Sequence, residues 1–267
     1  MKHVVITGST RGIGFGLARE FLKRGCKVVI SGRSENSVAK AVRELSSQFK
    51  PEHIVGIPCE VSKYADVEKL WQDAQKALGS IDIWINNAGI SNPTKPLWEL
   101  SSEEIANTIN TDLTGLLFCC RVAIAGMIQQ GHGQIYNMEG HGSDGSVRAG
   151  VTVYGAAKRA VRYLSKSLLA ETKGTPVQIC TLSPGIVITE FITEQRHAMS
   201  VEKWESNKKI FNIIADKVET VTPWLVEKIL TNDKTGARFF WLTRGKAISR
   251  FLTAVFKKRD LFKDLGI

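Results

Sequence analysis

The sequence predicts an α/β fold in which a doubly wound parallel sheet carries helices on both faces. Up to Pro184, short runs rich in β-branched residues alternate with longer amphipathic segments. The strand-like runs are almost continuously apolar, which is typical of strands covered on both faces. No linker, repeat or low-complexity tract divides the chain. Right-handed crossovers then give a doubly wound sheet within a single domain that spans residues 1–267.

The expected elements follow one another along the chain. Six segments predict strands, namely residues 3–7, 27–31, 53–59, 81–86, 133–138 and 176–182. Amphipathic segments between them predict helices, for example residues 16–25, 37–49 and 66–79. From about residue 186 the alternation breaks down into a helical and loop-like stretch, and a basic C-terminal extension follows.

Composition limits the class of protein. With 267 residues, 43% of them hydrophobic, the chain can bury one large core. The net charge of +10 suits anionic partners such as phosphates or acidic lipid headgroups. No nucleic-acid motif accompanies this charge, so nucleic acid is not expected as a partner. No apolar run of about 18 residues occurs, which predicts no membrane-spanning helix.

Targeting and metal binding are not expected either. The first strand begins at His3, so we expect no signal or transit peptide ahead of the fold, and either a cytoplasmic location or a targeting segment already removed. The cysteines lie in apolar stretches without C-x-x-C spacing, which predicts buried, reduced thiols and no metal site; they are Cys26, Cys59, Cys119, Cys120 and Cys180.

A glycine-rich turn follows the first strand and opens a helix. Its sequence over residues 7–14 is TGSTRGIG. Glycines permit a tight turn and let the backbone approach a pyrophosphate at the helix N-terminus. An ordinary strand-to-helix turn is the alternative, and the placement near the N-terminus favours a dinucleotide site. The expected contacts are Thr7, Gly8, Ser9, Arg11, Gly12, Ile13 and Gly14.

The end of the second strand distinguishes between two dinucleotides. A site for NAD would place a carboxylate there to accept from the ribose 2′-hydroxyl, but this chain has Arg33, with Arg11 in the first turn. Two guanidinium groups suit a 2′-phosphate, which arginine binds bidentately. The sequence therefore favours NADP(H), with a merely solvated Arg33 as the alternative.

Tyr154 and Lys158 lie four residues apart in a predicted helix and therefore share one face. The ordinary pKa of tyrosine is near 10. A neighbouring ammonium group favours the phenolate, so we expect Lys158 to lower the pKa of Tyr154 towards the range useful for proton transfer. A tyrosine and a lysine at this spacing usually have a structural role, and only the motifs around this pair indicate a catalytic one.

Four motifs carry a resemblance to a known family. TGSTRGIG, NNAG at residues 86–89, YGAAK at 154–158 and SPG at 183–185 occur in the order and spacing of short-chain dehydrogenases/reductases. The resemblance covers residues 1 to about 190. It implies a Rossmann-type, NADP(H)-dependent oxidoreductase of CH–OH and carbonyl groups, assembled as a homodimer or homotetramer. Tyr154 would donate and accept the proton, and Lys158 would also hold the nicotinamide ribose.

The same resemblance implies further cofactor contacts. Asn87, Ala88 and Gly89 would line the adenosine side. Glu60 and Val61 stand where an Asp-Val pair usually flanks the adenine. The nicotinamide carboxamide and the pyrophosphate would meet a last group of residues, namely Pro184, Gly185, Val187 or Ile188, and Thr189.

Two positions depart from the family pattern. The usual catalytic serine position holds Gly140 or His141, so we take Ser143 as the best substitute donor, with Ser146 and His141 as weaker candidates. The usual helix asparagine, which supports a water relay to the lysine, is replaced by Asp112. Asn110 lies two residues out of register and is a weaker alternative.

A narrower resemblance points to a substrate. Residues 81–89, 96–99, 137–146, 183–192 and 210–221 look like the corresponding stretches of chlorophyll b reductases of plants and their bacterial relatives. The resemblance implies reduction of the formyl group of a tetrapyrrole by NADPH, in chlorophyll catabolism. An alcohol dehydrogenase or acyl ketoreductase acting on a non-pigment substrate remains open. So does a nucleotide-sensing protein without turnover, against which the retained Tyr154 and Lys158 count.

The residues from about 186 would then form a substrate loop and the basic C-terminal extension. The tail mixes apolar residues and bases: Phe239, Phe240, Trp241, Phe251, Leu252, Val255 and Phe256 with Arg244, Lys246, Arg250, Lys257, Lys258, Arg259 and Lys263. One interpretation is peripheral contact with a membrane or a large apolar substrate. The other is that the apolar residues pack on the core or a subunit interface while the bases are solvated.

Overall fold

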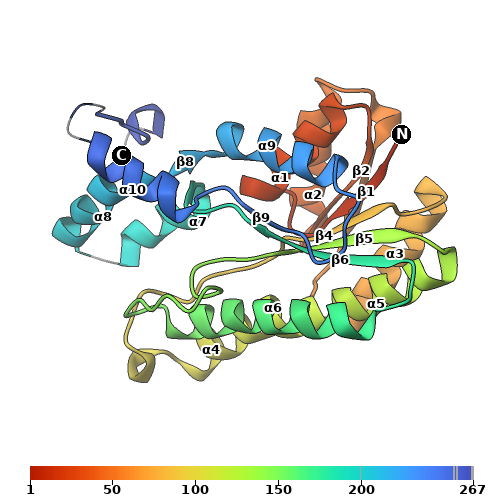
Figure 1. The fold of residues 1–267 in the computed structure, drawn as a ribbon, viewed down its shortest axis with the longest axis horizontal. Coiled ribbons are helices and arrows are strands. Elements are labelled where there is room, and N and C mark those ends of the chain that lie inside the picture. The colour runs from red at the N-terminus through yellow and green to blue at the C-terminus, as the bar shows by residue number, and fades with distance from the viewer. Residues whose placement is uncertain (199, 255, 257, 266–267) are drawn as a thin grey trace.

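Seven parallel strands form the central sheet of the computed structural model, which describes residues 1–198, 200–254, 256 and 258–265 (Figure 1). The strand order is β3-β2-β1-β4-β5-β6-β9. It reverses between β1 and β4, as in a doubly wound sheet. The strands are β1 (His3–Ile6), β2 (Lys27–Gly32), β3 (Ile54–Pro58), β4 (Ile83–Asn86), β5 (Gly133–Met138), β6 (Val177–Ser183) and β9 (Arg238–Phe240).

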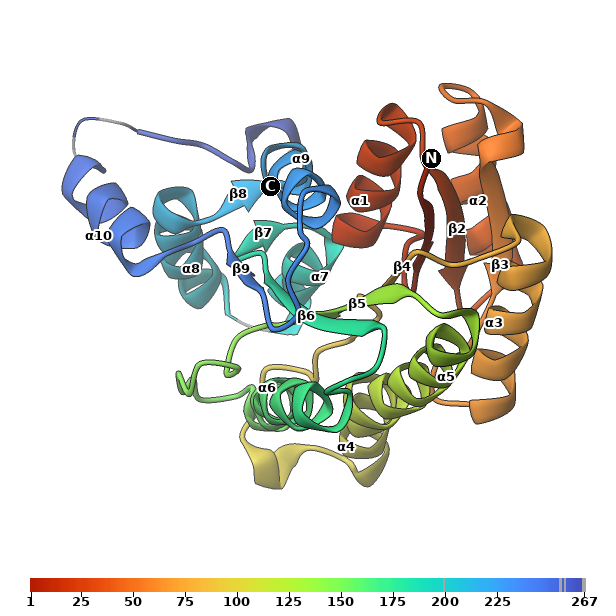
Figure 2. The ribbon, with the colours of Figure 1, turned by 45° about the vertical axis from the view of Figure 1, so that its right-hand side comes forward.

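Helices cover both faces of the sheet, which confirms the predicted fold class (Figures 1 and 2). One apolar layer joins the sheet to α1 (Gly12–Lys23), α2 (Glu35–Ser46) and α9 (Val218–Leu230). The opposite layer joins it to α3 (Tyr64–Leu78), α5 (Gly115–Gln130) and α6 (Thr152–Glu171). All five cysteines are buried and reduced, as predicted.

One helical stretch, residues Ser102–Gln130, has the length and mean hydropathy of a membrane span, although 44% of its most apolar window is buried within the protein. It comprises α4 (Ser102–Ile109), the π-helical turn η3 (Asn110–Thr114) and α5. Length and hydropathy alone do not distinguish a membrane span from a helix buried in a protein core. Cys119 and Ala123 pack into the core between the sheet and α3, so the stretch is a layer helix of this fold.

The edge strand β9 is the main element that the sequence analysis missed. It pairs in parallel with β6, Leu182 lying opposite Phe239. It is only three residues long and begins with a charged residue, so it lacks the apolar run that marks the other strands. A small second sheet, β7 (Val187–Ile188) with β8 (Asp216–Lys217), was also missed for its shortness.

Apart from α9 and β9, the segment after β6 lies largely outside the layers of the central sheet. It contains α7 (Glu190–Thr193), α8 (Val201–Ile214) and α10 (Arg244–Thr253), which lie on the left side of the ribbon in Figure 1. A separate aromatic cluster holds this part together; it includes Trp204, Phe211 and Phe262.

Candidate active site

A cavity of about 690 Å³ opens beyond the carboxyl ends of the parallel strands, where doubly wound folds bind ligands. It brings together most of the residues that the sequence singled out. Those that line it are Gly8, Arg11, Gly12, Ile13, Gly14, Arg33, Glu60, Val61, Asn87, Ala88, Gly89, Ser143, Tyr154, Lys158, Pro184, Gly185, Val187 and Thr189.

The glycine-rich turn has the backbone that a bound pyrophosphate requires. Gly8 and Gly12 both have positive φ, +62° and +58°, which favours glycine. A Cβ on Gly8 would lie 2.8 Å from Ala88 Cα, and one on Gly14 would lie 2.4 Å from the Gly8 carbonyl oxygen. Side chains at these positions would therefore close the cradle at the start of α1.

Thr7 and Ser9 are buried beneath this turn, where they hold the framework together. The Thr7 hydroxyl accepts hydrogen bonds from the backbone N–H groups of Asn87 and Ala88, each 3.1 Å long. The Ser9 hydroxyl donates to the Ile6 carbonyl (2.7 Å). Both predicted cofactor contacts thus serve to join β1 to its neighbours and fix the turn.

Asn87 acts in the same way. Its side-chain amide donates to the carbonyl oxygens of Thr7 and Gly8, both at 2.9 Å. The end of β4 is thereby tied to the glycine-rich turn. Asn87 still lines the cavity, but its amide hydrogens are committed to the backbone.

The predicted phosphate-binding arginines sit in different surroundings. Arg33 follows β2 at the cavity wall and is exposed. Arg11 also lines the cavity, and its guanidinium group pairs with Glu194 at the surface. Two hydroxyl-bearing residues that the sequence analysis missed, Thr10 and Ser37, line the same end. Thr10 lies within the glycine-rich turn and Ser37 follows Arg33 by four residues, and these positions in the sequence could have identified both.

Glu60 and Val61 lie at the expected adenine side of the cavity. The Glu60 carboxylate accepts a hydrogen bond from the Ser62 hydroxyl (3.1 Å). Its own backbone N–H donates to Asp66 (3.1 Å). Asp66 thus fixes the loop after β3, a role that only the folded chain reveals.

Tyr154 and Lys158 occupy the first turns of α6, and Lys158 Nζ lies 5.5 Å from the centre of the Tyr154 ring. The start of α6 is held by Asn92, whose side-chain oxygen accepts from the Tyr154 backbone N–H (3.1 Å). Asn92 also donates to the Gly150 carbonyl (3.1 Å) and is buried. Sequence reasoning missed Asn92, although it stands three residues after Gly89 in the loop that leads away from the NNAG motif.

Asp112 projects from η3 and meets Lys158 below the cavity. Its Oδ2 lies 3.1 Å from Lys158 Nζ, and its Oδ1 accepts from the Ile90 backbone N–H at 2.7 Å. Both side chains are buried. Burial raises the pKa of Asp112. For Lys158, burial opposes the charged form, but the negative charge of Asp112 outweighs it and raises the pKa.

The net effect on Tyr154 differs from the sequence-based expectation. Burial raises the pKa of its phenol above the ordinary value; Lys158 opposes this, while Asp112 reinforces it. Lys158 thus acts in the expected direction, but burial outweighs it and the pKa of Tyr154 lies above the ordinary value instead of below it. The sequence could not weigh burial against two opposite charges.

The loop between β5 and α6 explains the missing family serine. A Cβ on Gly140 would lie 2.3 Å from the Tyr154 hydroxyl, so the backbone leaves no room for a side chain there. Ser143 is buried, and its hydroxyl accepts from the Gly140 backbone N–H (3.0 Å). The hydroxyl hydrogen of Ser143 remains available, and Ser143 lines the cavity.

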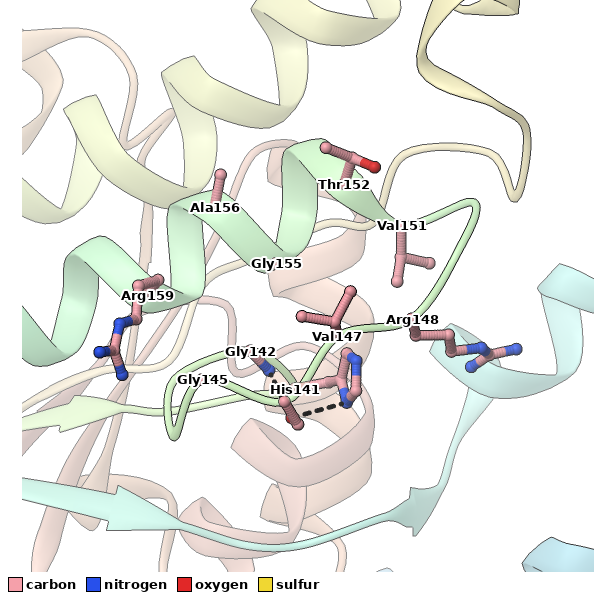
Figure 3. A pocket seen from close by; sticks show the side chains of 11 residues that line it. His141, Gly142, Gly145, Val147, Arg148, Val151, Thr152, Gly155, Ala156 and Arg159 are labelled. Carbon is pink, nitrogen blue, oxygen red and sulfur yellow. Dashed lines mark hydrogen bonds between the residues drawn. The ribbon is translucent and has the colours of Figure 1, made fainter.

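The weaker serine candidate, Ser146, also lines the main cavity but differs from Ser143 in burial and partners. Ser146 is exposed, and its hydroxyl lies 3.4 Å from His141 Nδ1. Both residues also line a second cavity of about 440 Å³ between this loop and α6, shown in Figure 3. Burial and the charge of Arg148 lower the pKa of His141.

An ion pair inside the main cavity was not predicted at all. Glu139 follows β5 directly, is buried, and binds the Arg238 guanidinium of β9 through both carboxylate oxygens. The Arg238 guanidinium also stacks 3.9 Å from the centre of the Phe240 ring. The partners are far apart in sequence, and β9 itself was missed, so no local signal joined them.

The C-terminal tail divides into anchored and exposed residues. Arg250 and Arg259 both pair with Asp216, at 2.8 and 2.9 Å, and the Trp241 indole N–H donates to the same carboxylate. Burial by itself would raise the pKa of Asp216, but these partners hold the pKa below its ordinary value. Lys246 lies 3.1 Å from the centre of the Trp241 ring.

The rest of the tail includes an apolar stripe. Phe239 and Trp241 pack against the core above the sheet. Ile248, Phe251 and Leu252 are exposed at spacings that place them along one side of α10, and Phe256 beyond the end of this helix is exposed as well. Val255 and Lys257, which the sequence analysis included, lie outside the described residues.

The chain is similar to several known oxidoreductases. The chlorophyll(ide) b reductase NOL of Arabidopsis thaliana is 41% identical over 270 residues, covering 99% of this chain and 74% of that protein. The probable chlorophyll(ide) b reductase NYC1 of the same plant is 38% identical over 281 residues, and the chain spans only 55% of its length. An NADP-dependent 3-hydroxy acid dehydrogenase, YdfG of Escherichia coli (strain K12), is 32% identical over 184 residues, covering 69% of this chain and 72% of that protein.

Solved structures share the overall fold. A serine dehydrogenase complexed with NADP⁺ has a TM-score of 0.77 and 27% identity, covering 90% of this chain and 94% of its own. A gluconate 5-dehydrogenase from Burkholderia cenocepacia, in complex with NADP and tartrate, has a TM-score of 0.77 and 25% identity, covering 93% and 95%. The family model of the short chain dehydrogenases matches residues 2–200. The chain therefore belongs to the short chain dehydrogenase family.

Proposed function

We propose that the protein is an NADPH-dependent carbonyl reductase whose substrate is the formyl group of chlorophyll b or a related tetrapyrrole. The observation that carries the proposal is the pairing of a half-buried Tyr154 with a buried Lys158 at the wall of the cavity that the glycine-rich turn also lines. The substrate class is supported by the names of the two plant reductases, which this chain matches over nearly its whole length.

The residues present fit NADP(H). The cradle formed by Gly8, Gly12 and Gly14 leaves space that a Cβ would fill, and helix α1 begins at that point. Arg33, at the end of β2, presents a guanidinium group to the cavity, which suits a 2′-phosphate. Pro184, Gly185 and Thr189 line the opposite end, where we place the nicotinamide. When bound, the cofactor supplies the hydride, and the protein's part is to position it.

Each catalytic residue has a defined task in this proposal. Tyr154 donates its phenolic proton to the substrate oxygen as negative charge develops there. Lys158 stabilises the phenolate that remains and holds the nicotinamide ribose. Ser143 donates a hydrogen bond to the same substrate oxygen, which stabilises the transition state more than the ground state.

Oxidation of NADPH, followed by its absorbance, tests the proposal directly. Chlorophyllide b and chlorophyll b would be offered beside 3-oxo acids, because YdfG is by name a dehydrogenase of 3-hydroxy acids and 3-oxo acids are the corresponding carbonyl compounds. Formation of the hydroxymethyl pigment supports the proposal. Turnover of the acids alone would favour the second candidate, a dehydrogenase of small hydroxy acids. Tight NADPH binding without turnover of any of these compounds would favour a nucleotide sensor.

We also propose how the protein is placed and assembled. The tail exposes four apolar residues, Ile248, Phe251, Leu252 and Phe256, and the bases Arg244 and Lys258 are exposed in the same segment; such a composition suits peripheral contact with an anionic lipid surface. We expect a cytoplasmic protein that visits this surface, whereas the plant relatives are chloroplastic by name. A homodimer or homotetramer is the expected assembly, and light scattering tests it.

A further inference from the structure

Asp112 sits at an irregular point of its helix. The turn Asn110–Thr114 is π-helical, a distortion that is frequent at functional sites. The side chain is 1% exposed, and its Oδ1 accepts the Ile90 backbone N–H at 2.7 Å. An asparagine would make this last contact equally well through its amide oxygen. The carboxylate therefore adds a charge that the backbone contact does not require.

The second carboxylate oxygen, Oδ2, interacts with Lys158 within the described part of the chain. Oδ2 is buried and forms an ion pair with Lys158 Nζ, 3.1 Å away. Gly89 closes over the pair, because a Cβ on it would lie 3.1 Å from Oδ2 and 3.2 Å from Nζ. Charge attraction between two buried ions is thus the interaction that Oδ2 makes.

These two charges are the ones that act on the Tyr154 phenol. Lys158 comes from α6 and Asp112 from η3, and α7 contributes the uncharged Phe191 ring, 5.6 Å from the Tyr154 ring. Other charged residues line the same cavity, and they are Arg11, Arg33, Glu60, Asp144, Arg148, Glu190 and the paired Glu139 and Arg238.

We propose that Asp112 is a positioning residue that acts through Lys158: it cancels the ammonium charge beside Tyr154 and keeps this phenol protonated up to alkaline pH. The inference rests on the proposed function, because it assigns the site a preferred protonation state for reduction. Reduction breaks the Tyr154 O–H bond and forms an O–H bond on the substrate oxygen, so it needs the phenol. Oxidation of an alcohol needs the phenolate instead.

The consequence is a separation of the two directions by pH. Reduction should proceed across the neutral range, since Tyr154 stays in its acid form there. Oxidation should require alkaline conditions. The overall equilibrium is unchanged, because an enzyme cannot alter it; Asp112 sets the pH at which each direction has its competent form of Tyr154.

The test is the ionisation of Tyr154 in the full-length protein, read as tyrosinate absorbance without substrate. Subtracting the titration of Tyr154→Phe isolates this residue from the other tyrosines. We expect Tyr154 to ionise above about pH 10, the ordinary value for tyrosine. In Asp112→Asn, measured against Asp112→Asn/Tyr154→Phe, the ionisation should fall by about 1 pH unit or more, as expected when an uncancelled ammonium group remains nearby.

Asp73→Asn is the matched control, since it removes the same charge from an exposed pair with Lys69 and should leave the titration unchanged. Ionisation of Tyr154 well below pH 10 in the parent protein overturns the inference, and this arm decides even if Asp112→Asn does not fold. A folded Asp112→Asn that titrates with the parent also overturns it.

The pH dependence of kcat gives a second readout. The alkaline limb of the reduction profile should move to lower pH in Asp112→Asn and stay in place in Asp73→Asn. The two proposals can fail separately. A chain that titrates as expected but reduces no carbonyl with NADPH refutes the proposed function, whereas one that reduces a carbonyl but titrates well below pH 10 refutes the role of Asp112.

Discussion

The absence of a side chain at position 140 is the most sharply defined steric requirement of the site. A Cβ there would lie 2.3 Å from the Tyr154 hydroxyl oxygen, whereas ordinary contact begins at 3.4 Å. Gly140→Ala must therefore displace the phenol or the loop by about 1 Å. A misplacement of about 1 Å at a reacting group can cost about 100-fold in rate. That factor corresponds to about 2.7 kcal/mol of transition-state stabilisation.

Steady-state turnover of NADPH with the best carbonyl substrate measures this effect. We expect kcat of Gly140→Ala to fall about 100-fold while NADPH binding stays close to that of the parent. Gly140→Ser, which restores the residue usual in the family, should be no better. Gly155→Ala is the matched control, because Gly155 lies next to Tyr154 in α6 and a Cβ on it would meet no atom within 4 Å. Gly140→Ala with kcat within about threefold of the parent, less than about 1 kcal/mol, would refute the steric argument.

The remaining site predictions use single side-chain deletions. Arg33→Ala should weaken NADPH binding by roughly 1.5–3 kcal/mol and leave NADH almost unaffected; equal use of both cofactors by the parent enzyme would contradict the assignment. Tyr154→Phe should abolish turnover and keep the fold, so activity within about tenfold of the parent would identify a different proton donor. Ser143→Ala should lower kcat about 100-fold to 1000-fold and Ser146→Ala should change it little, and the reverse ranking would show that the loop places the wrong serine.

The parts of the site that depend on short stretches of sequence were predictable. The glycine-rich turn is recognisable by its place after a strand, and Tyr154 and Lys158 by their spacing on one helix. The central strands were found because burial on both faces leaves an unbroken apolar run. In each case neighbours along the chain carry the signal.

The missed features depend on partners far apart in the sequence. Glu139 and Arg238 are joined only because β9 pairs beside β6. Asn92 gains its role by meeting the start of α6. The pKa of Tyr154 is set by burial and by two opposite charges from different helices, and no pattern along the chain gives their balance.

The C-terminal tail contains exposed apolar residues that are recognisable in the sequence, and also basic residues whose partners lie far away in the chain. Arg250 and Arg259 are committed to Asp216, so the bases left for a lipid surface include Arg244 and Lys258. Burial of a leucine or phenylalanine side chain is worth about 1.5–3 kcal/mol, and each base near an anionic surface adds about 1 kcal/mol. Phe251→Ser/Leu252→Ser should therefore weaken binding to anionic vesicles at least about tenfold in co-sedimentation, and salt should weaken binding of the parent. Tyr163→Ser, which removes an exposed aromatic residue from α6, is the control. If the parent stays in the supernatant at low salt, the stripe has another partner.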